Sequence, residues 1–228
     1  MTRLHYHGHS TFTLTSDDGT RIIIDPWFDG NPVSDVRADE IDGVDFILCT
    51  HGHSDHFADA IPLAKRTGAT LVSTFEIVSF AQSQGVENAH PLHIGGGFNF
   101  PFGYVKMTPA LHGGQVDGDN EGLYTTVPGG FWINLDGKRI YHAGDTALLT
   151  DMQLLRGKVD LALLPIGDNF TMGPEDAARA VEFIRPKTVI PIHYNTFDLI
   201  AQDPEAFRAQ VGDLARVEIV QPGETFDF

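Results

Sequence analysis

The chain has 228 residues, of which 42% are hydrophobic and 20% are charged, a balance typical of a folded protein with a buried core and not of a disordered chain. A formal net charge of −16, with no run of basic residues, argues against binding to nucleic acid. No apolar run approaches the roughly 20 residues of a membrane helix, the first residues lack the apolar core of a secretory signal, and Cys49 is the only cysteine, so we expect a cytoplasmic protein with no membrane partner.

In the first half of the chain, hydrophobic patterning predicts a hairpin followed by alternating strands and helices. The hairpin comprises residues 10–16 and 21–28, joined by an Asp-Asp-Gly-Thr turn. Residues 44–50 are a continuous apolar run, which indicates a strand that is covered on both faces. A helix ending at Gly68, a buried strand and a second helix are expected at 57–68, 69–74 and 75–85.

The second half of the chain repeats this order. A hairpin is predicted from residues 129–135 and 139–146, around an Asp-Gly-Lys turn. An apolar strand opens the segment 160–170, and a helix is expected at 173–186 with Pro174 in its first turn. A last strand lies within 187–195.

Two similar halves, about 1–98 and 99–228, therefore make up what we predict to be one domain spanning residues 1–228. The joint lies in the Gly-, Pro- and Phe-rich segment 95–103, which is predicted to be a turn region. Two such halves pack most simply as two sheets face to face with helices outside. The predicted fold class is thus α/β, in the form of a four-layer α/β/β/α sandwich, and the loops after the strands of both halves would meet at one edge.

The segment with the clearest chemistry directly follows the apolar strand at 44–50. It reads His51-Gly-His53-Ser-Asp55-His56, so three imidazoles and a carboxylate lie within six positions. Imidazole and carboxylate ligands suit zinc and related first-row metal ions, and the small residues between them allow a sharp turn. A solvated loop whose histidines bind nothing is the alternative, and such a density of ligands after a buried strand argues against it.

Three further candidate ligands stand at the ends of other predicted strands. His112 follows an apolar strand, and His193 ends the last one. Asp145 lies in a turn beside a glycine, where its carboxylate could bridge two ions. Together with the histidine cluster, these residues supply enough donors for two metal ions.

The motifs "GHSTF", "THGHSDH", "IYHAGDT", "LPIGDNFTMG" and "PIHYNTF" resemble those of the metallo-β-lactamase superfamily, and within it a bacterial family of metal-dependent hydrolases related to ascorbate-6-phosphate lactonase. The resemblance covers the whole chain and implies two divalent metal ions, Zn in the first instance, with Mn, Fe or Ni as alternatives. It implies His51, His53 and His112 on the first ion, Asp55, His56 and His193 on the second, and Asp145 as the bridge. It also implies that Asp25 hydrogen-bonds to the histidine loop and fixes its shape.

One departure from the family pattern lies beside the third histidine. Leu111 stands where a bulky aromatic residue is expected, and Gly113 and Gly114 follow His112. These residues are predicted to leave His112 in place and to widen the pocket next to it.

A second group of residues is expected to support the ligands or to contact substrate: His9, Asp25, Asp168, Asn169 and Asn195. For His9, a core position is an equal alternative. Asp168 and Asn169 occupy the second-half loop that corresponds to the histidine cluster, and Asn195 and Thr196 follow His193. His142 is predicted to point away from the metals. For Phe100, Phe102 and Phe170, lining the cleft and packing elsewhere both remain open.

The predicted function is that of a dinuclear metal-dependent hydrolase. Two cations would lower the pKa of a bound water, and the metal-bound hydroxide would attack a small ester, lactone or phosphoester. Asp55, His56 and Asp145 are the predicted catalytic residues, with Asp55 able to pass on a proton. The alternative is a non-catalytic metal-binding or ligand-sensing protein on the same fold. The expected partner is a small-molecule substrate, and a homo-oligomer is expected by analogy alone.

Overall fold

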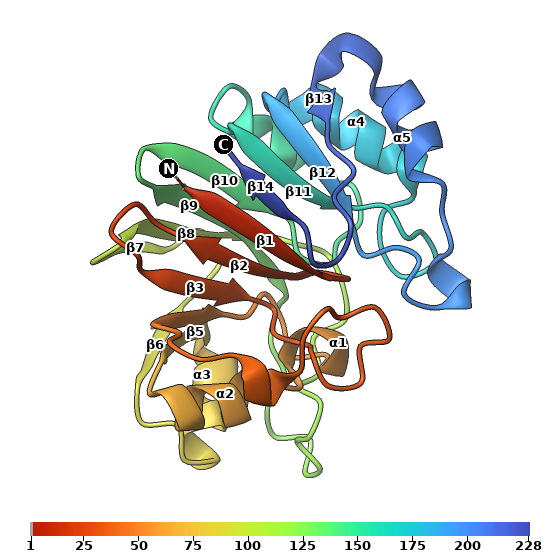
Figure 1. The fold of residues 1–228 in the computed structure, drawn as a ribbon. Coiled ribbons are helices and arrows are strands. Elements are labelled where there is room, and N and C mark those ends of the chain that lie inside the picture. The colour runs from red at the N-terminus through yellow and green to blue at the C-terminus, as the bar shows by residue number, and fades with distance from the viewer. Residues whose placement is uncertain (1) are drawn as a thin grey trace.

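Two seven-stranded sheets lie face to face at the centre of the structure, a computed structural model that describes residues 2–228 (Figure 1). One apolar cluster fills the space between the sheets, where Phe12 and Leu48 from the first sheet pack with Met107 and Phe131 from the second. Two further apolar clusters lie between each sheet and the helices outside it. The predicted four-layer α/β/β/α sandwich is therefore confirmed.

The first sheet has the strand order β14-β1-β2-β3-β4-β5-β6. Its strands are β1 (Arg3–Gly8), β2 (Thr11–Thr15), β3 (Arg21–Ile24), β4 (Phe46–Leu48), β5 (Thr70–Thr74), β6 (Ala89–Leu92) and β14 (Thr225–Asp227). The helical segments near it are η1 (Ala38–Glu40), α1 (Ser54–Phe57), α2 (Ala60–Thr67) and α3 (Phe75–Ser83). Helices α2 and α3 cover its outer face (Figure 1).

The second sheet has the strand order β13-β12-β11-β10-β9-β8-β7. Its strands are β7 (Gly97–Phe100), β8 (Gly103–Pro109), β9 (Gly129–Leu135), β10 (Lys138–His142), β11 (Leu161–Pro165), β12 (Thr188–Ile192) and β13 (Arg216–Val217). The helical segments near it are η2 (Thr150–Leu155), α4 (Pro174–Ile184), η3 (Asp198–Ile200), α5 (Pro204–Val211) and η4 (Gly212–Leu214). Helices α4 and α5 cover its outer face (Figure 1).

The two sheets share one plan of strand pairing. In the first, β1, β2 and β3 are antiparallel neighbours, and β3 to β6 are parallel. In the second, β8, β9 and β10 are antiparallel and β10 to β13 are parallel. The last strand of each half joins the sheet of the other, since β7 pairs with β8 and β14 pairs with β1. This correspondence supports our proposal of one domain made of two similar halves.

The segment 95–103 is not only a turn region, as its composition predicted. It contains β7, which pairs with β8 across a tight turn at residues 101–102. Phe100 and Phe102 are buried in the core between the sheets, so they pack there and do not line a cleft. The sequence missed this strand because glycine and proline are read as turn signals, whereas pairing with β8 and burial of the Phe100 ring decide the conformation.

Helix ends follow the local signals of the sequence. Helix α2 ends at Gly68, whose φ of 75° is left-handed and whose N–H donates to the carbonyl of Ala64. Helix α4 begins at Pro174, with Glu175 and Asp176 in the first turn, where carboxylates stabilise the positive end of the helix. No helix within residues 2–228 is long and apolar enough to span a membrane.

Candidate metal centre

The histidine cluster after β4 is held by Asp25, which directly follows β3. The Asp25 carboxylate accepts hydrogen bonds from the backbone N–H and the hydroxyl of Thr50, both at 2.7 Å. It lies 2.8 Å from Nδ1 of His56. A carboxylate only accepts, so Nδ1 of His56 carries the proton of this hydrogen bond and Nε2 is directed into the site. Asp55 and His56 lie on the single turn of α1 and not on an irregular loop.

The ring nitrogens of His51, His53 and His112 converge on one point. Nε2 of His51 lies 3.1 Å from Nδ1 of His53, and Nε2 of His112 lies 3.2 Å from the same atom. Two nitrogens bound to one tetrahedral zinc ion, each about 2.0–2.1 Å from it, are separated by about 3.3 Å. The three nitrogens are therefore spaced as ligands of one ion.

Asp145 lies between this group and a second one. Its Oδ2 is 3.5 Å from Nε2 of His112 and 3.0 Å from Nε2 of His193, and its Oδ1 is 3.2 Å from Nε2 of His56. Asp55 faces the same two histidines, with Oδ2 at 3.8 Å from Nε2 of His193 and 4.0 Å from Nε2 of His56. Each half of the chain thus contributes donors to one centre.

Four buried side-chain atoms of three residues at this centre have no hydrogen-bond partner within residues 2–228. They are Nε2 of His56, Oδ1 of Asp145, and Nδ1 and Nε2 of His193. Leaving buried polar atoms unpaired is costly, and such atoms in a native protein indicate a missing partner. Imidazole nitrogens and carboxylate oxygens gathered around common points are the donors that divalent first-row cations prefer, so these residues fit metal ions.

Burial and the neighbouring carboxylates shift the pKa values of the histidines in opposite directions. Burial lowers the pKa of His51 and of His112, which keeps both rings neutral and able to bind a metal. Burial acts in the same direction on His193, but the Asp145 carboxylate outweighs it and raises the pKa to about 9. The pKa of Asp145 is held well below its usual range in spite of burial, because His193 and His56 lie beside it. Metal ions binding here compete with protons.

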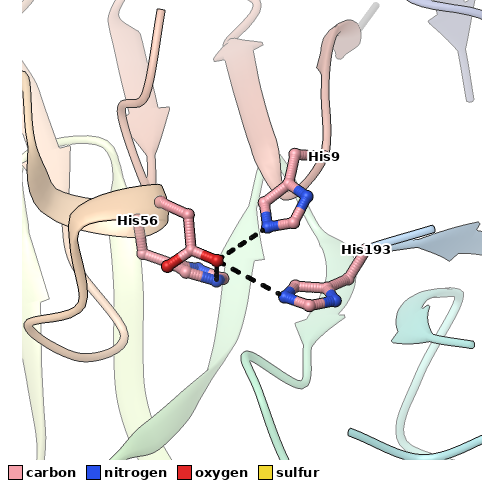
Figure 2. A group of neighbouring side chains, drawn as sticks. His9, His56 and His193 are labelled. Atoms are coloured by element: carbon pink, nitrogen blue, oxygen red, sulfur yellow. Dashed lines mark hydrogen bonds and ion pairs between the residues drawn. The ribbon is translucent and has the colours of Figure 1, made fainter. Parts of the chain in front are cut away.

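His9 reaches the same centre from the turn between β1 and β2. Its Nε2 lies 3.2 Å from Oδ2 of Asp55, and its Nδ1 lies 2.8 Å from the hydroxyl of Thr196. Figure 2 shows the rings of His9, His56 and His193 directed toward one carboxylate oxygen, which is Oδ2 of Asp55. Burial, together with the neighbouring His193, lowers the pKa of His9 to about 4. His9 is therefore both a buried residue and a contact of a candidate ligand.

Left-handed backbone conformations gather among the predicted site residues. Within residues 2–228, eight non-glycine residues have positive φ, and six of them are site candidates: His9, Asp25, Asp168, Asn169, His193 and Asn195. This conformation costs roughly 1–2 kcal/mol for a residue with a Cβ and is retained where the surrounding structure enforces it, often at functional sites.

The remaining candidates lie further from the ligands. Asp168 and Asn169 are exposed, and the backbone hydrogen bonds of Asp168 to Thr171 and Met172 stay within the loop after β11. Asn195 is exposed and accepts a hydrogen bond from the N–H of Gln202 at 2.8 Å, which closes the loop around η3. 

His142 points away from the ligands, toward the carbonyl of Ser10 at 3.1 Å. Its Nδ1 accepts a hydrogen bond from the N–H of Gly144, so it shapes the turn that carries Asp145.

Two threonines that we did not single out also shape the site. Thr50 links Asp25 to the histidine loop, and the hydroxyl of Thr146 accepts a hydrogen bond from the N–H of Leu111 at 3.0 Å, which ties the Asp145 turn to the His112 loop. The only sequence signal was that each threonine adjoins a candidate ligand.

The two glycines after His112 do not widen a pocket, contrary to the prediction. A Cβ on Gly113 would lie 3.1 Å from Cε1 of His53, and a Cβ on Gly114 would lie 1.8 Å from the carbonyl oxygen of Thr126. The space beside both glycines is therefore filled. Gly113 makes room for a candidate ligand, and Gly114 for a neighbouring stretch of backbone.

Known proteins share both the sequence and the fold of this chain. Residues 20–194 match the family described as the beta-lactamase superfamily domain. The chain is 49% identical over 235 residues to a UPF0173 metal-dependent hydrolase of Heliobacterium modesticaldum, with 99% of this chain and 97% of the relative covered. It is 48% identical over 229 residues to one from Shouchella clausii, with 99% of each chain covered.

Solved structures show the same similarity. Igni18, described as a novel metallo hydrolase from the archaeon Ignicoccus hospitalis, superposes with a TM-score of 0.88 at 38% identity, over 100% of this chain and 99% of that one. An isothiocyanate hydrolase from Delia radicum gut bacteria has a TM-score of 0.75 at 21% identity, over 99% of both chains, which is a similarity of fold.

Proposed function

Since the chain belongs to the metallo-β-lactamase superfamily and is a metal-dependent hydrolase, we propose that it hydrolyses a small ester, lactone or phosphoester at a centre of two divalent metal ions. In this proposal His51, His53 and His112 would hold one ion, Asp55, His56 and His193 would hold the other, and Asp145 would contribute to both. The observation that carries the proposal is the position of the Asp145 carboxylate. It lies within 3.5 Å of histidines from both groups, while its Oδ1 has no hydrogen-bond partner among residues 2–228.

Metal ions held by these residues would supply an activated water and would stabilise the negative charge that develops on the substrate. The protein residues orient the centre. Asp25 fixes the ring of His56 so that Nε2 faces inward. Asp55 has 26% of its side chain exposed and borders both solvent and the centre, so it is placed to accept a proton at Oδ2. His9 holds that oxygen at 3.2 Å.

A cysteine nucleophile does not enter this mechanism. Cys49 directly follows β4 and is buried, and this burial raises the pKa of its thiol well above the usual value. The thiol therefore stays protonated and serves to pack the core.

The test is metal analysis combined with a panel of chromogenic esters, lactones and phosphodiesters. We expect about two ions per chain and turnover of at least one panel member, with zinc tried first and Mn, Fe and Ni after it. The double variant His53→Ala/Asp145→Ala removes a ligand and the bridge, so it should lose at least about a hundredfold in kcat/KM. Full activity of this variant would refute the proposal. The double variant His90→Ala/Asp151→Ala, outside the centre, is the control.

Bound metal without turnover of any panel member would favour the alternative, a metal-binding or ligand-sensing protein on the same fold. We also propose a cytoplasmic location and self-association of the chain. Light scattering of the purified protein measures its oligomeric state, and fractionation of cells locates it.

A further inference from the structure

Positive charge is absent from the segments that build the metal centre. The ligands and their supports lie in the loops that follow the carboxyl ends of the strands: 9–10, 25–36, 49–59, 110–128, 143–149, 166–173 and 193–203. None of these segments contains a lysine or an arginine, although the chain has fifteen. An anionic group of a substrate would therefore meet no guanidinium or ammonium group from these loops.

The basic residues gather at the opposite end of the sandwich. Arg21 opens β3, Lys138 and Arg139 open β10, and Lys187 precedes β12. Lys65 and Arg66 lie in the last turn of α2. Two of them form ion pairs there, since Arg139 and Lys187 lie 2.9 and 2.8 Å from the carboxylate of Asp160.

The two other basic residues closest in sequence to the site loops pair with, or lie beside, residues that are not candidate ligands. Arg37 pairs with Asp39 at 3.1 Å, and Lys106 borders a cavity beside Trp132.

The charge of the metal centre itself is nearly balanced. Two divalent ions carry four positive charges, and the carboxylates of Asp25, Asp55 and Asp145 carry three negative ones. Further carboxylates in the same loops, such as Asp117 and Asp168, add negative charge around the centre. A second anionic group on a substrate would thus be desolvated without a partner and repelled by its surroundings.

Apolar side chains lie beside the centre instead. The ring of Phe197 has its centroid 5.9 Å from that of His9, and the ring of Phe170 lies 6.5 Å from Phe197. These two rings are 38% and 49% exposed, and Leu111, next to His112, is 63% exposed. Single exposed apolar residues are common, but adjacent rings at the border of a reactive centre form a contact surface for an apolar ligand.

We propose that the substrate carries no phosphate or carboxylate group away from its reacting bond, and that it places an aromatic or alkyl group against Phe170 and Phe197. This inference rests on the proposed hydrolase function and narrows its substrate class to apolar esters, lactones and phosphoesters that have no anionic group away from the reacting bond.

The experiment measures binding of three hydroxamates to the metal-loaded protein by calorimetry, because hydroxamates chelate metal ions and need no turnover. The probes are acetohydroxamate, phenylacetohydroxamate and the para-carboxylate of the latter. We expect phenylacetohydroxamate to bind about tenfold more tightly than acetohydroxamate, since its ring is removed from water. The para-carboxylate derivative should lose this gain in affinity. Phe170→Ala and Phe197→Ala should weaken phenylacetohydroxamate about fivefold and leave acetohydroxamate unchanged.

The matched control is Phe98→Ala. Phe98 is 46% exposed, like Phe170, but contacts His90 and Phe100 away from the centre, so its removal should change no affinity. Equal or tighter binding of the para-carboxylate would overturn the inference, with the metal centre intact as long as acetohydroxamate binds. Failure of the metal-loaded protein to bind any probe would overturn the proposed function as well.

Discussion

At the scale of single residues, the centre depends on side chains that never face the substrate. Asp25 makes three hydrogen bonds with Thr50 and His56, and it sets both the path of the histidine loop and the tautomer of one candidate ligand. Thr196 and Asp55 lie at the two ring nitrogens of His9. Partners of this kind orient ligands and contribute to metal affinity without touching the metal.

Replacement of Asp25 by alanine tests this role. Asp25→Ala removes the acceptor for Nδ1 of His56 and should lower the affinity for the second metal ion about 10–100-fold. Competition with a chromophoric chelator measures the affinity. Asp29→Ala, at a carboxylate four residues away, is the control and should bind metal normally. Wild-type affinity in Asp25→Ala would show that the carboxylate does not orient its histidine.

Gly144 tests how tightly the Asp145 turn is packed. Its φ is 63°, and an added Cβ would lie 2.7 Å from the carbonyl oxygen of Gly129 and 3.0 Å from Cβ of Thr50. Gly144→Ala should therefore lower the free energy of unfolding by about 2–4 kcal/mol. Gly157 has a similar φ of 71°, and no atom of residues 2–228 lies within 4 Å of an added Cβ. Gly157→Ala therefore isolates the backbone strain and should cost only about 1 kcal/mol. Urea denaturation measures both variants. An equal loss of free energy of unfolding in Gly144→Ala and Gly157→Ala would mean that the close contacts at Gly144 contribute nothing.

At the scale of elements, an ion pair joins the amino ends of three parallel strands of the second sheet. Asp160, just before β11, accepts hydrogen bonds from the backbone and guanidinium of Arg139 at the start of β10. Lys187, just before β12, lies 2.8 Å from the same carboxylate. These contacts fix the strands at the end that faces away from the metal centre.

The pH dependence of stability reports this ion pair. The hydrogen bond from Arg139 lowers the pKa of Asp160 below its usual range. The ionised Asp160 therefore contributes fully to the free energy of unfolding above about pH 4, and this contribution is lost as the pH falls below that value. Asp160→Asn should lower the free energy of unfolding by about 1 kcal/mol at pH 7, with a smaller difference from the wild type at pH 3. Denaturant titrations at the two pH values measure this, and a difference that does not shrink in acid would contradict it.

At the scale of the whole molecule, the candidate ligands come from both halves of the chain. His51, His53, Asp55 and His56 belong to the first half, whereas His112, Asp145 and His193 belong to the second. Ions bound between them would connect the two sheets, and ligands that bind only the folded state stabilise it.

Removal of metal should therefore destabilise the protein as a whole. At a free metal concentration a hundred times the dissociation constant, each ion adds about 2.7 kcal/mol, which raises the Tm by roughly 5–10 °C for a chain of this size. Thermal unfolding with excess zinc and with a chelator measures the shift. His53→Ala/Asp145→Ala should show little of it, and an identical Tm of the wild type in both conditions would contradict metal binding at the centre.

The sequence by itself determined the layered fold and the chemical type of the site. The periodicity of the apolar residues and the repeated order of elements predicted two sheets with helices outside, because burial of one face per element leaves few arrangements. The spacing of His51, His53, Asp55 and His56 predicted metal chemistry, because ligands that follow one strand are neighbours in space whatever the rest of the chain does. Helix ends at Gly68 and Pro174 were likewise local properties.

Only the tertiary structure decided which distant residues meet. Contacts of His9 with Asp55 and Thr196 join segments far apart in the chain, and no local pattern encodes them. The strand β7 was missed because Gly97 and the two glycines before it signal a turn, while pairing with β8 and burial of Phe100 decide its conformation. The separation of basic residues from the metal centre follows from strand direction. In the parallel strands β3 to β6 and β10 to β13, the first residues lie at one end of the sheet and the last residues at the other, and the fold alone brings each set together.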